Sequence, residues 1–205
     1  MEVKYLGWQS FRFQEGGRAV VTQPFSQSKT GVLFPKIKAD LVLQTRKTEN
    51  SLKKRVTGLK NGRVFWTPGP GEYEVNGIEI RGFASGYWLK MRSFQLAFWW
   101  SLEIKDVNKS TNAFPDIDIL FLRIGKTSKG FAKKVKEISR KISPTYLIPF
   151  CLESMDQKEL TKGLWVKPFL DALDQEDVGP IGKLSINQDN IASEELKVVL
   201  LKPKI

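Results

Sequence analysis

The polar run from Gln44 to Ser51 contains the residues of this chain that are best placed to do chemistry. It follows an apolar strand that we predict over residues 40–44, and reactive groups of α/β proteins gather in the loops at strand ends. The run includes a cation, Arg46, and small polar side chains at Thr48, Asn50 and Ser51. A cation and weak neutral oxygens are poor ligands for zinc. The run therefore predicts no metal binding of the usual kind.

Histidine and cysteine usage narrows the chemistry further. The chain of 205 residues has no histidine and a single cysteine, Cys151. The commonest metal ligand and the commonest general base are thus both missing, and no internal disulfide or multi-thiolate zinc site is available. Two unusual sites stay open: a metal held by carboxylates and Cys151, or Ser51 as a nucleophile with Lys47 or Lys53 as its base. A lone thiol is more often a small buried apolar residue, and we expect no cofactor.

Positive charge is concentrated in two segments of the chain. The formal net charge is +11, and residues 29–63 and 123–141 together hold 18 of the 33 Lys and Arg residues. If the fold brings these segments together, they form one positive patch that attracts polyanions. Its candidate binding residues are Lys53, Lys54, Arg55, Lys133, Lys134 and Lys136. The alternative is a solvated surface that only keeps the protein soluble.

Strand and turn signals dominate the first half of the sequence. Alternating residues predict three antiparallel strands at 2–5, 11–14 and 19–22, with a turn at Glu15-Gly16-Gly17. The run from Thr67 to Gly82 predicts a turn, a strand, a hairpin at Asn76-Gly77 and a second strand. Residues 94–104 predict one long strand, and we find no second strand between 89 and 112.

Helical and buried-strand signals mark the second half. Continuous apolar runs predict strands at 119–122 and 146–149, and a last strand is expected at 198–201. Apolar residues at spacings of four, three and four predict a helix over 128–142, capped by Thr127 or Ser128. A short helix is predicted from Lys167-Pro168 to Leu173. No linker separates these elements, so we predict one α/β domain over residues 1–205.

Two motifs resemble the metallo-β-lactamase fold. The strand at 40–44 and the turn after it are similar to the place where that family carries His-x-His-x-Asp-His, and the frame puts Arg46, Thr48, Asn50 and Ser51 at the ligand positions. Gly69-Pro70-Gly71-Glu72-Tyr73 resembles a hairpin of a bacterial branch similar to ascorbate-phosphate lactonase-like proteins, and Cys151 stands where the last ligand would be. The resemblance implies an αβ/βα sandwich of two mixed sheets with helices on the outer faces.

The chain keeps the sequence pattern of the family but lacks the side chains that bind metal. We therefore predict a degenerate member that acts by binding. We interpret the chain as a catalytically inactive binding or assembly module, with nucleic acid, an acidic partner or a second copy of the chain as candidate partners. The alternative is a hydrolase of the same superfamily with a non-standard or metal-free active site. No run of eighteen apolar residues and no basic and apolar leader occurs, so we expect a cytoplasmic protein without a membrane partner.

Overall fold

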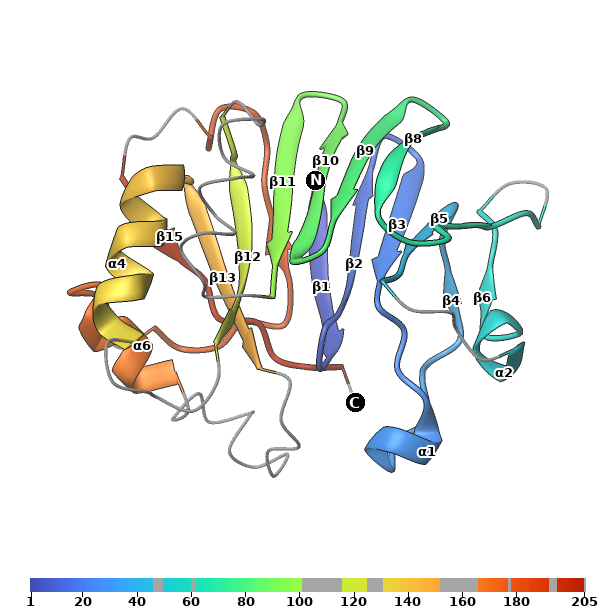
Figure 1. The fold of residues 1–205 in the computed structure, drawn as a ribbon, viewed down its shortest axis with the longest axis horizontal. Helices are drawn as coiled ribbons and strands as arrows, with labels where there is room; N and C mark the ends of the chain where they lie inside the picture. Colours follow the sequence, from blue (N-terminus) through green and yellow to red (C-terminus); the bar gives the residue numbers. More distant parts are fainter. Residues whose placement is uncertain are drawn as a thin grey trace.

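Two mixed β-sheets face one another across a shared apolar core in the computed structural model (Figure 1). The structure describes residues 1–45, 50–59, 62–100, 116–124, 131–151, 166–176, 178–191 and 195–204. No helix within these ranges is long and apolar enough to cross a membrane. The α/β class and the two-sheet architecture predicted from the sequence are confirmed.

The N-terminal residues build most of a six-stranded sheet, as the alternating pattern predicted. Its order is β14-β1-β2-β3-β5-β7, antiparallel from β14 to β3 and parallel from β3 to β7. Gly16 and Gly17 form the turn between β2 and β3 with φ of 53° and 75°, a region that glycine enters without strain. The strands are β1 (Glu2–Gly7), β2 (Ser10–Glu15), β3 (Arg18–Thr22), β5 (Leu41–Leu43), β7 (Phe65–Trp66) and β14 (Leu184–Ser185).

The second sheet has seven strands in the order β15-β13-β12-β11-β10-β9-β8. The predicted hairpin joins β8 to β9, with Asn76 and Gly77 at φ of 53° and 71° in a two-residue turn. Strands β11, β12, β13 and β15 run parallel, and β8 to β11 are antiparallel. The strands are β8 (Gly71–Val75), β9 (Ile78–Phe83), β10 (Gly86–Met91), β11 (Phe94–Trp99), β12 (Ile119–Ile124), β13 (Tyr146–Cys151) and β15 (Lys197–Val198).

The expectation of a single strand between 89 and 112 was wrong. Gly86–Met91 forms β10 and pairs with β11 through a tight turn at Arg92-Ser93, where Arg92 has a φ of 57°. Both faces of β10 are buried, so the strand lacks the alternation by which a half-exposed strand is recognised. The last strand is also shorter than predicted: β15 ends at Val198, and Leu201 makes only an isolated bridge to Ile181.

Helices α4 (Phe131–Ile142) and α6 (Lys167–Ala172) cover the outer face of the seven-stranded sheet (Figure 1). The predicted apolar stripe of α4 is buried there, whereas the proposed cap residues Thr127 and Ser128 lie outside the described ranges. The short helices α1 (Gln27–Thr30) and α2 (Asn50–Lys53) accompany the other sheet, with a two-stranded sheet of β4 (Ile37–Lys38) and β6 (Val56–Thr57) beside α2.

Aromatic side chains fill the space between the sheets. Phe98 of β11 and Phe121 of β12 stack at 4.1 Å, and Phe11 and Phe13 of β2 pack against them from the opposite sheet. Such rings bury large apolar areas, and their contacts add to the stability gained from burial alone. The core therefore fixes how the two sheets meet. It thereby fixes the positions of the loops that follow β5 and β9.

Candidate functional site

The polar turn after β5 is tied into the protein by its first two residues. The Gln44 backbone N–H donates to Thr67 Oγ1 at 2.9 Å, and its side-chain Nε2 donates to the Thr67 carbonyl at 2.8 Å. Thr45 Oγ1 accepts from Gln23 Nε2 at 2.9 Å. Gln44 and Thr67 are both buried, and buried polar groups of this kind require partners.

Tyr87 connects the two sheets at this point. Its hydroxyl donates to the Gln44 carbonyl and lies 3.2 Å from both Thr67 Oγ1 and the Gly69 carbonyl oxygen. The residue is only 1% exposed, and burial raises the pKa of its phenol above the usual value. Tyr87 is therefore a neutral hydrogen-bond donor, suited to holding β10 and β5 together.

Trp100 packs against Tyr87. Its ring meets that of Tyr87 edge to face, with centroids 5.8 Å apart, and its Nε1 donates to the Ala84 carbonyl at 3.3 Å. The backbone N–H of Trp100 donates to the Ser85 carbonyl at 3.0 Å. Ala84 and Ser85 follow the hairpin that resembles the bacterial branch, and both of their carbonyls accept hydrogen bonds from Trp100.

Of the residues at the expected ligand positions, the structure describes Asn50, Ser51 and the backbone of Cys151, and these lie on two separate elements. Asn50 and Ser51 begin α2 and are exposed, while Cys151 ends β13 beside Ile124 of β12. Figure 1 shows α2 and β13 in different halves of the molecule. Arg46 and Thr48, like the side chain of Cys151, lie outside the described part of the chain.

This donor set does not fit a zinc centre. Among the described residues no three His, Cys, Asp or Glu side chains group closely enough to hold a metal ion, and the sequence as a whole contains no histidine. Amide and hydroxyl oxygens are weak zinc ligands compared with imidazole and thiolate. The hydrogen bonds among Gln44, Thr67 and Tyr87 satisfy the buried polar groups of this region.

The two basic clusters do not form the single patch that was expected. α2, which leads into Lys54 and Arg55, lies at one end of the long axis, and α4 lies at the other end (Figure 1). The reason is topological: α2 adjoins the small sheet of β4 and β6, whereas α4 covers the far sheet. Arg55 is also engaged, since its Nε donates to the Phe34 carbonyl, and Lys136 pairs with Asp174 at 2.8 Å.

Sequence reasoning missed the buried network of Gln44, Thr67 and Tyr87 and the Trp100 ring that packs against it. Gln44 ends an apolar strand and Thr67 opens a Pro-Gly turn, so each was a polar residue next to a predicted core. That position is a signal, because a buried amide or hydroxyl must find a partner. The identity of the partner, however, depends on contacts between residues 20 to 43 positions apart.

Comparison with known proteins identifies the superfamily of this chain. A model of the beta-lactamase superfamily domain matches residues 2–108, which is more than half of the chain. The chain belongs to this superfamily. No curated protein matches it, so the remaining comparisons are with solved structures.

Three solved structures share the superfamily fold over almost all of this chain. A candidate Zn-dependent hydrolase of the metallo-beta-lactamase superfamily from Thermotoga maritima is 24% identical, with a TM-score of 0.68 and 98% of each chain covered. A candidate metal-dependent hydrolase from Parabacteroides distasonis is 14% identical, with a TM-score of 0.57, covering 98% of this chain and 93% of its own. A metallo hydrolase from Ignicoccus hospitalis is 11% identical, with a TM-score of 0.54, covering 91% and 99%. At these identities the likeness establishes the fold.

Proposed function

We propose that this chain is a non-catalytic member of the superfamily that acts by binding. The observation that carries the proposal is the complete lack of histidine in a fold whose family motif is built on it. The hydrogen bonds among Gln44, Thr67 and Tyr87 support it, because they satisfy the buried polar groups beside the turn after β5 within the chain itself. On this interpretation the chain keeps the fold of the superfamily and lacks its catalytic activity.

Metal content tests the proposal. The purified protein, dialysed against a chelator and then against buffer with zinc, is expected to retain no stoichiometric zinc, iron or manganese in elemental analysis. A matched variant restores the family pattern through Arg46→His, Thr48→His, Asn50→Asp and Ser51→His and is expected to take up zinc. About one tightly held metal per wild-type chain would refute the proposal. Absence of zinc from both proteins would show that these four positions do not decide metal binding.

A hydrolase with a non-standard site is the second candidate, favoured by the hydrolase names of the three similar structures. Its metal-free form has weak geometric support. Ser51 and Lys53 stand two residues apart on α2, and side chains at that spacing on a helix do not face each other. Lys47 lies outside the described residues. Turnover of ester or phosphoester substrates that Ser51→Ala abolishes and Asn50→Ala preserves would favour this candidate over the first.

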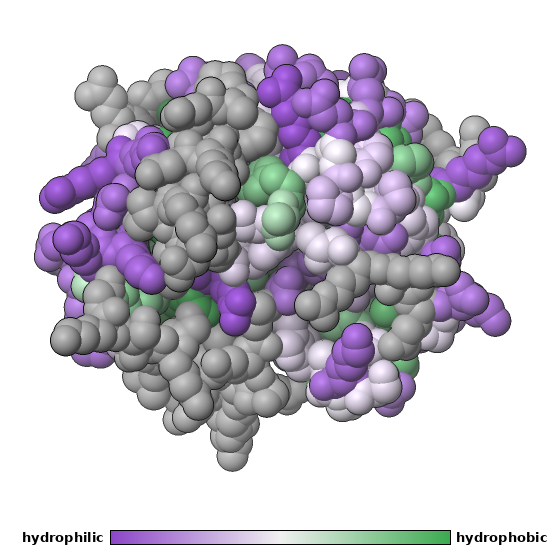
Figure 2. Space-filling model, viewed as in Figure 1, coloured by the Kyte–Doolittle hydropathy of each residue, from purple (hydrophilic) through white to green (hydrophobic). Residues whose placement is uncertain are grey.

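We propose α4 as the polyanion-binding element of the binding module. Five basic residues and one acidic residue, Glu137, lie along the helix, whereas Arg55 of the α2 cluster donates a hydrogen bond to the Phe34 carbonyl. Hydrophilic side chains project over α4 at the left of Figure 2. When Lys and Arg side chains neutralise phosphates, the counterions condensed on the nucleic acid are released. The affinity should therefore fall steeply as the salt concentration rises.

Titration of a labelled oligonucleotide at several salt concentrations tests this element. Changing Lys133 and Lys134 to Glu is expected to abolish binding, and the matched reversal of Lys53 and Lys54 is expected to preserve most of it. Equal losses in both variants would mean that net charge alone governs binding, and absence of binding at low salt would remove nucleic acid as a partner. Self-association remains a prediction that light scattering after size-exclusion chromatography can check.

A further inference from the structure

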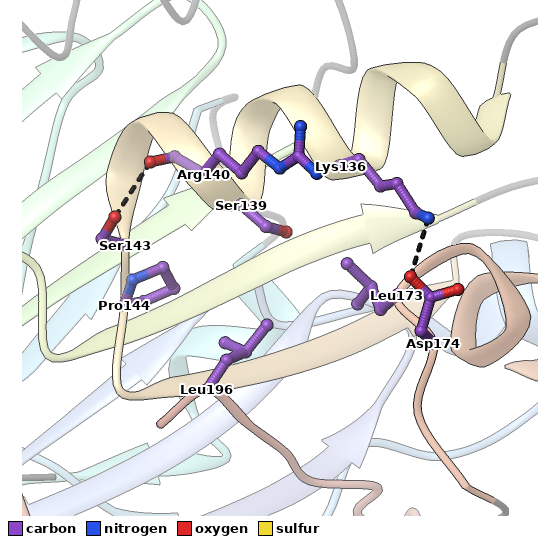
Figure 3. Close-up of a pocket in the computed structure, with 8 residues that line it drawn as sticks. All are labelled: Lys136, Ser139, Arg140, Ser143, Pro144, Leu173, Asp174 and Leu196. Carbon is purple, nitrogen blue, oxygen red and sulfur yellow. Dashed lines mark hydrogen bonds and ion pairs between the residues drawn. The ribbon is translucent and has the colours of Figure 1, made fainter. Parts of the chain in front are cut away.

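A groove lies between α4 and α6, away from the turn that follows β5 (Figure 1). It encloses about 280 Å³, close to the lower end of the range of roughly 300–1,000 Å³ usual for small-molecule sites. Apolar groups from Pro144, Leu173 and Leu196 form part of its wall, and polar groups complete it (Figure 3). The lining residues are Lys136, Ser139, Arg140, Ser143, Pro144, Leu173, Asp174 and Leu196.

Ser139 is the unusual member of this lining. It is 7% exposed, and its hydroxyl has no hydrogen-bond partner in the part of the chain that the structure describes. A buried hydroxyl without a partner costs stability, and within a helix serine usually bonds to the carbonyl four residues earlier. In Figure 3 the Ser139 side chain projects from α4 into the groove, on the side of Leu173 and Leu196. The hydroxyl is thus an enclosed donor beside the groove, unpartnered among the described residues, and a turn about the Cα–Cβ bond would let a bound molecule satisfy it.

Charges at the rim define what kind of molecule fits. Lys136 donates to Asp174 across the mouth at 2.8 Å, so its charge is largely balanced there. The Arg140 guanidinium makes no ion pair with any residue in the described ranges and lies along the same side of α4. Two cations and one carboxylate leave the groove one positive charge. A single anionic group matches that charge, and a dianion would meet Asp174 unfavourably.

We infer that this groove binds a small monoanionic carboxylate with an apolar body. The carboxylate pairs with Arg140, whose planar fork suits bidentate binding, and accepts the hydroxyl proton of Ser139 as a hydrogen bond. The apolar body packs on Leu173, Leu196 and Pro144. The groove lies on the same helix as the proposed polyanion-binding element, but Lys133 and Lys134 do not line it. The inference holds whether or not the chain is catalytic.

Nuclear magnetic resonance titration with sodium benzoate and sodium hexanoate tests the site directly. Both carboxylates are expected to shift amide signals of α4 and of residues 173–174, while benzyl alcohol and inorganic phosphate are expected to bind far more weakly. Arg140→Gln should weaken benzoate binding about 10- to 100-fold, the usual effect of losing a charged hydrogen bond. Lys133→Gln removes the same charge from the same helix outside the groove and should leave the affinity unchanged.

A second pair of variants separates binding from folding. Ser139→Ala removes an unsatisfied hydroxyl and should raise the thermal midpoint by roughly 2–4 °C while weakening benzoate binding. Asp174→Asn should improve phosphate binding relative to benzoate, because the repelling carboxylate is gone. Failure of both carboxylates to bind, or equal benzoate affinity in Arg140→Gln and Lys133→Gln, overturns the inference. Phosphate binding as tight as benzoate binding in the wild-type protein does so too.

Discussion

Replacing Tyr87 by phenylalanine removes one hydroxyl from the contact between the two sheets. The ring stays in the core, so the change removes only the hydroxyl, with its hydrogen bond to the Gln44 carbonyl and its 3.2 Å contacts to Thr67 Oγ1 and the Gly69 carbonyl oxygen. That carbonyl is not left without a donor, because Thr67 Oγ1 lies 3.3 Å from it. The expected loss is therefore close to one net hydrogen bond, about 1 kcal/mol of unfolding free energy. For a chain of this length that corresponds to a fall of roughly 2–4 °C in Tm.

Urea and thermal unfolding followed by circular dichroism measure this loss. Tyr73→Phe is the matched control: its hydroxyl donates to the Gly69 carbonyl at 2.9 Å from a partly exposed position, where water can replace it. The control should change stability by no more than about 0.5 kcal/mol. If Tyr87→Phe costs no more than Tyr73→Phe, the hydroxyl does not stabilise the contact between the sheets, and the reasoning fails.

Tyr87→Phe should also change how the stability of the protein depends on pH. The folded protein holds the proton of Tyr87 to a higher pH than the unfolded chain does, because burial raises the pKa of the phenol. The folded state then binds more protons above a pH of about 10, the usual pKa of tyrosine, and stability falls as pH rises through that range. Tyr87→Phe lacks this loss. The stability difference between wild type and variant should shrink between neutral and alkaline pH, and a constant difference would contradict the assignment.

Three further predictions concern the scaffold. Phe121→Ala should cost about 3–5 kcal/mol in urea unfolding, because Phe121 is fully buried and stacks on Phe98 at 4.1 Å. Gly86→Ala should cost about 1–3 kcal/mol, since a Cβ there would come within 2.0 Å of the Phe98 carbonyl oxygen; a neutral effect would show that β10 can shift. Lys4 and Lys183 lower the pKa of Glu2 to about 2, so their contribution is present above the usual value of 4.5 and is lost as pH falls toward 2. Glu2→Gln should flatten the acid limb of stability against pH, and an unchanged limb would exclude Glu2 as its source.

Local patterns in the sequence determined most of the sheet architecture. Asn76-Gly77 specifies its hairpin because the two left-handed φ angles suit these residues, and the apolar stripe of α4 specifies the helix and its buried face. Strand β10 escaped this reasoning, because burial on both faces removes the alternation that marks a strand. The sequence also shows which residue types are missing, and a chain without histidine cannot build a histidine site.

Contacts between distant residues decided what the sequence could not. The Gln44, Thr67 and Tyr87 network joins positions up to 43 residues apart, and no local pattern encodes which buried polar groups will meet. Long-range packing likewise separated the basic residues of α2 from those of α4, although both segments are strongly positive in sequence. It also placed Ser139 beside Leu173 and Leu196 in a groove. Residue types set the chemistry available to this protein, and the packing of the two sheets decided which of those residues act together.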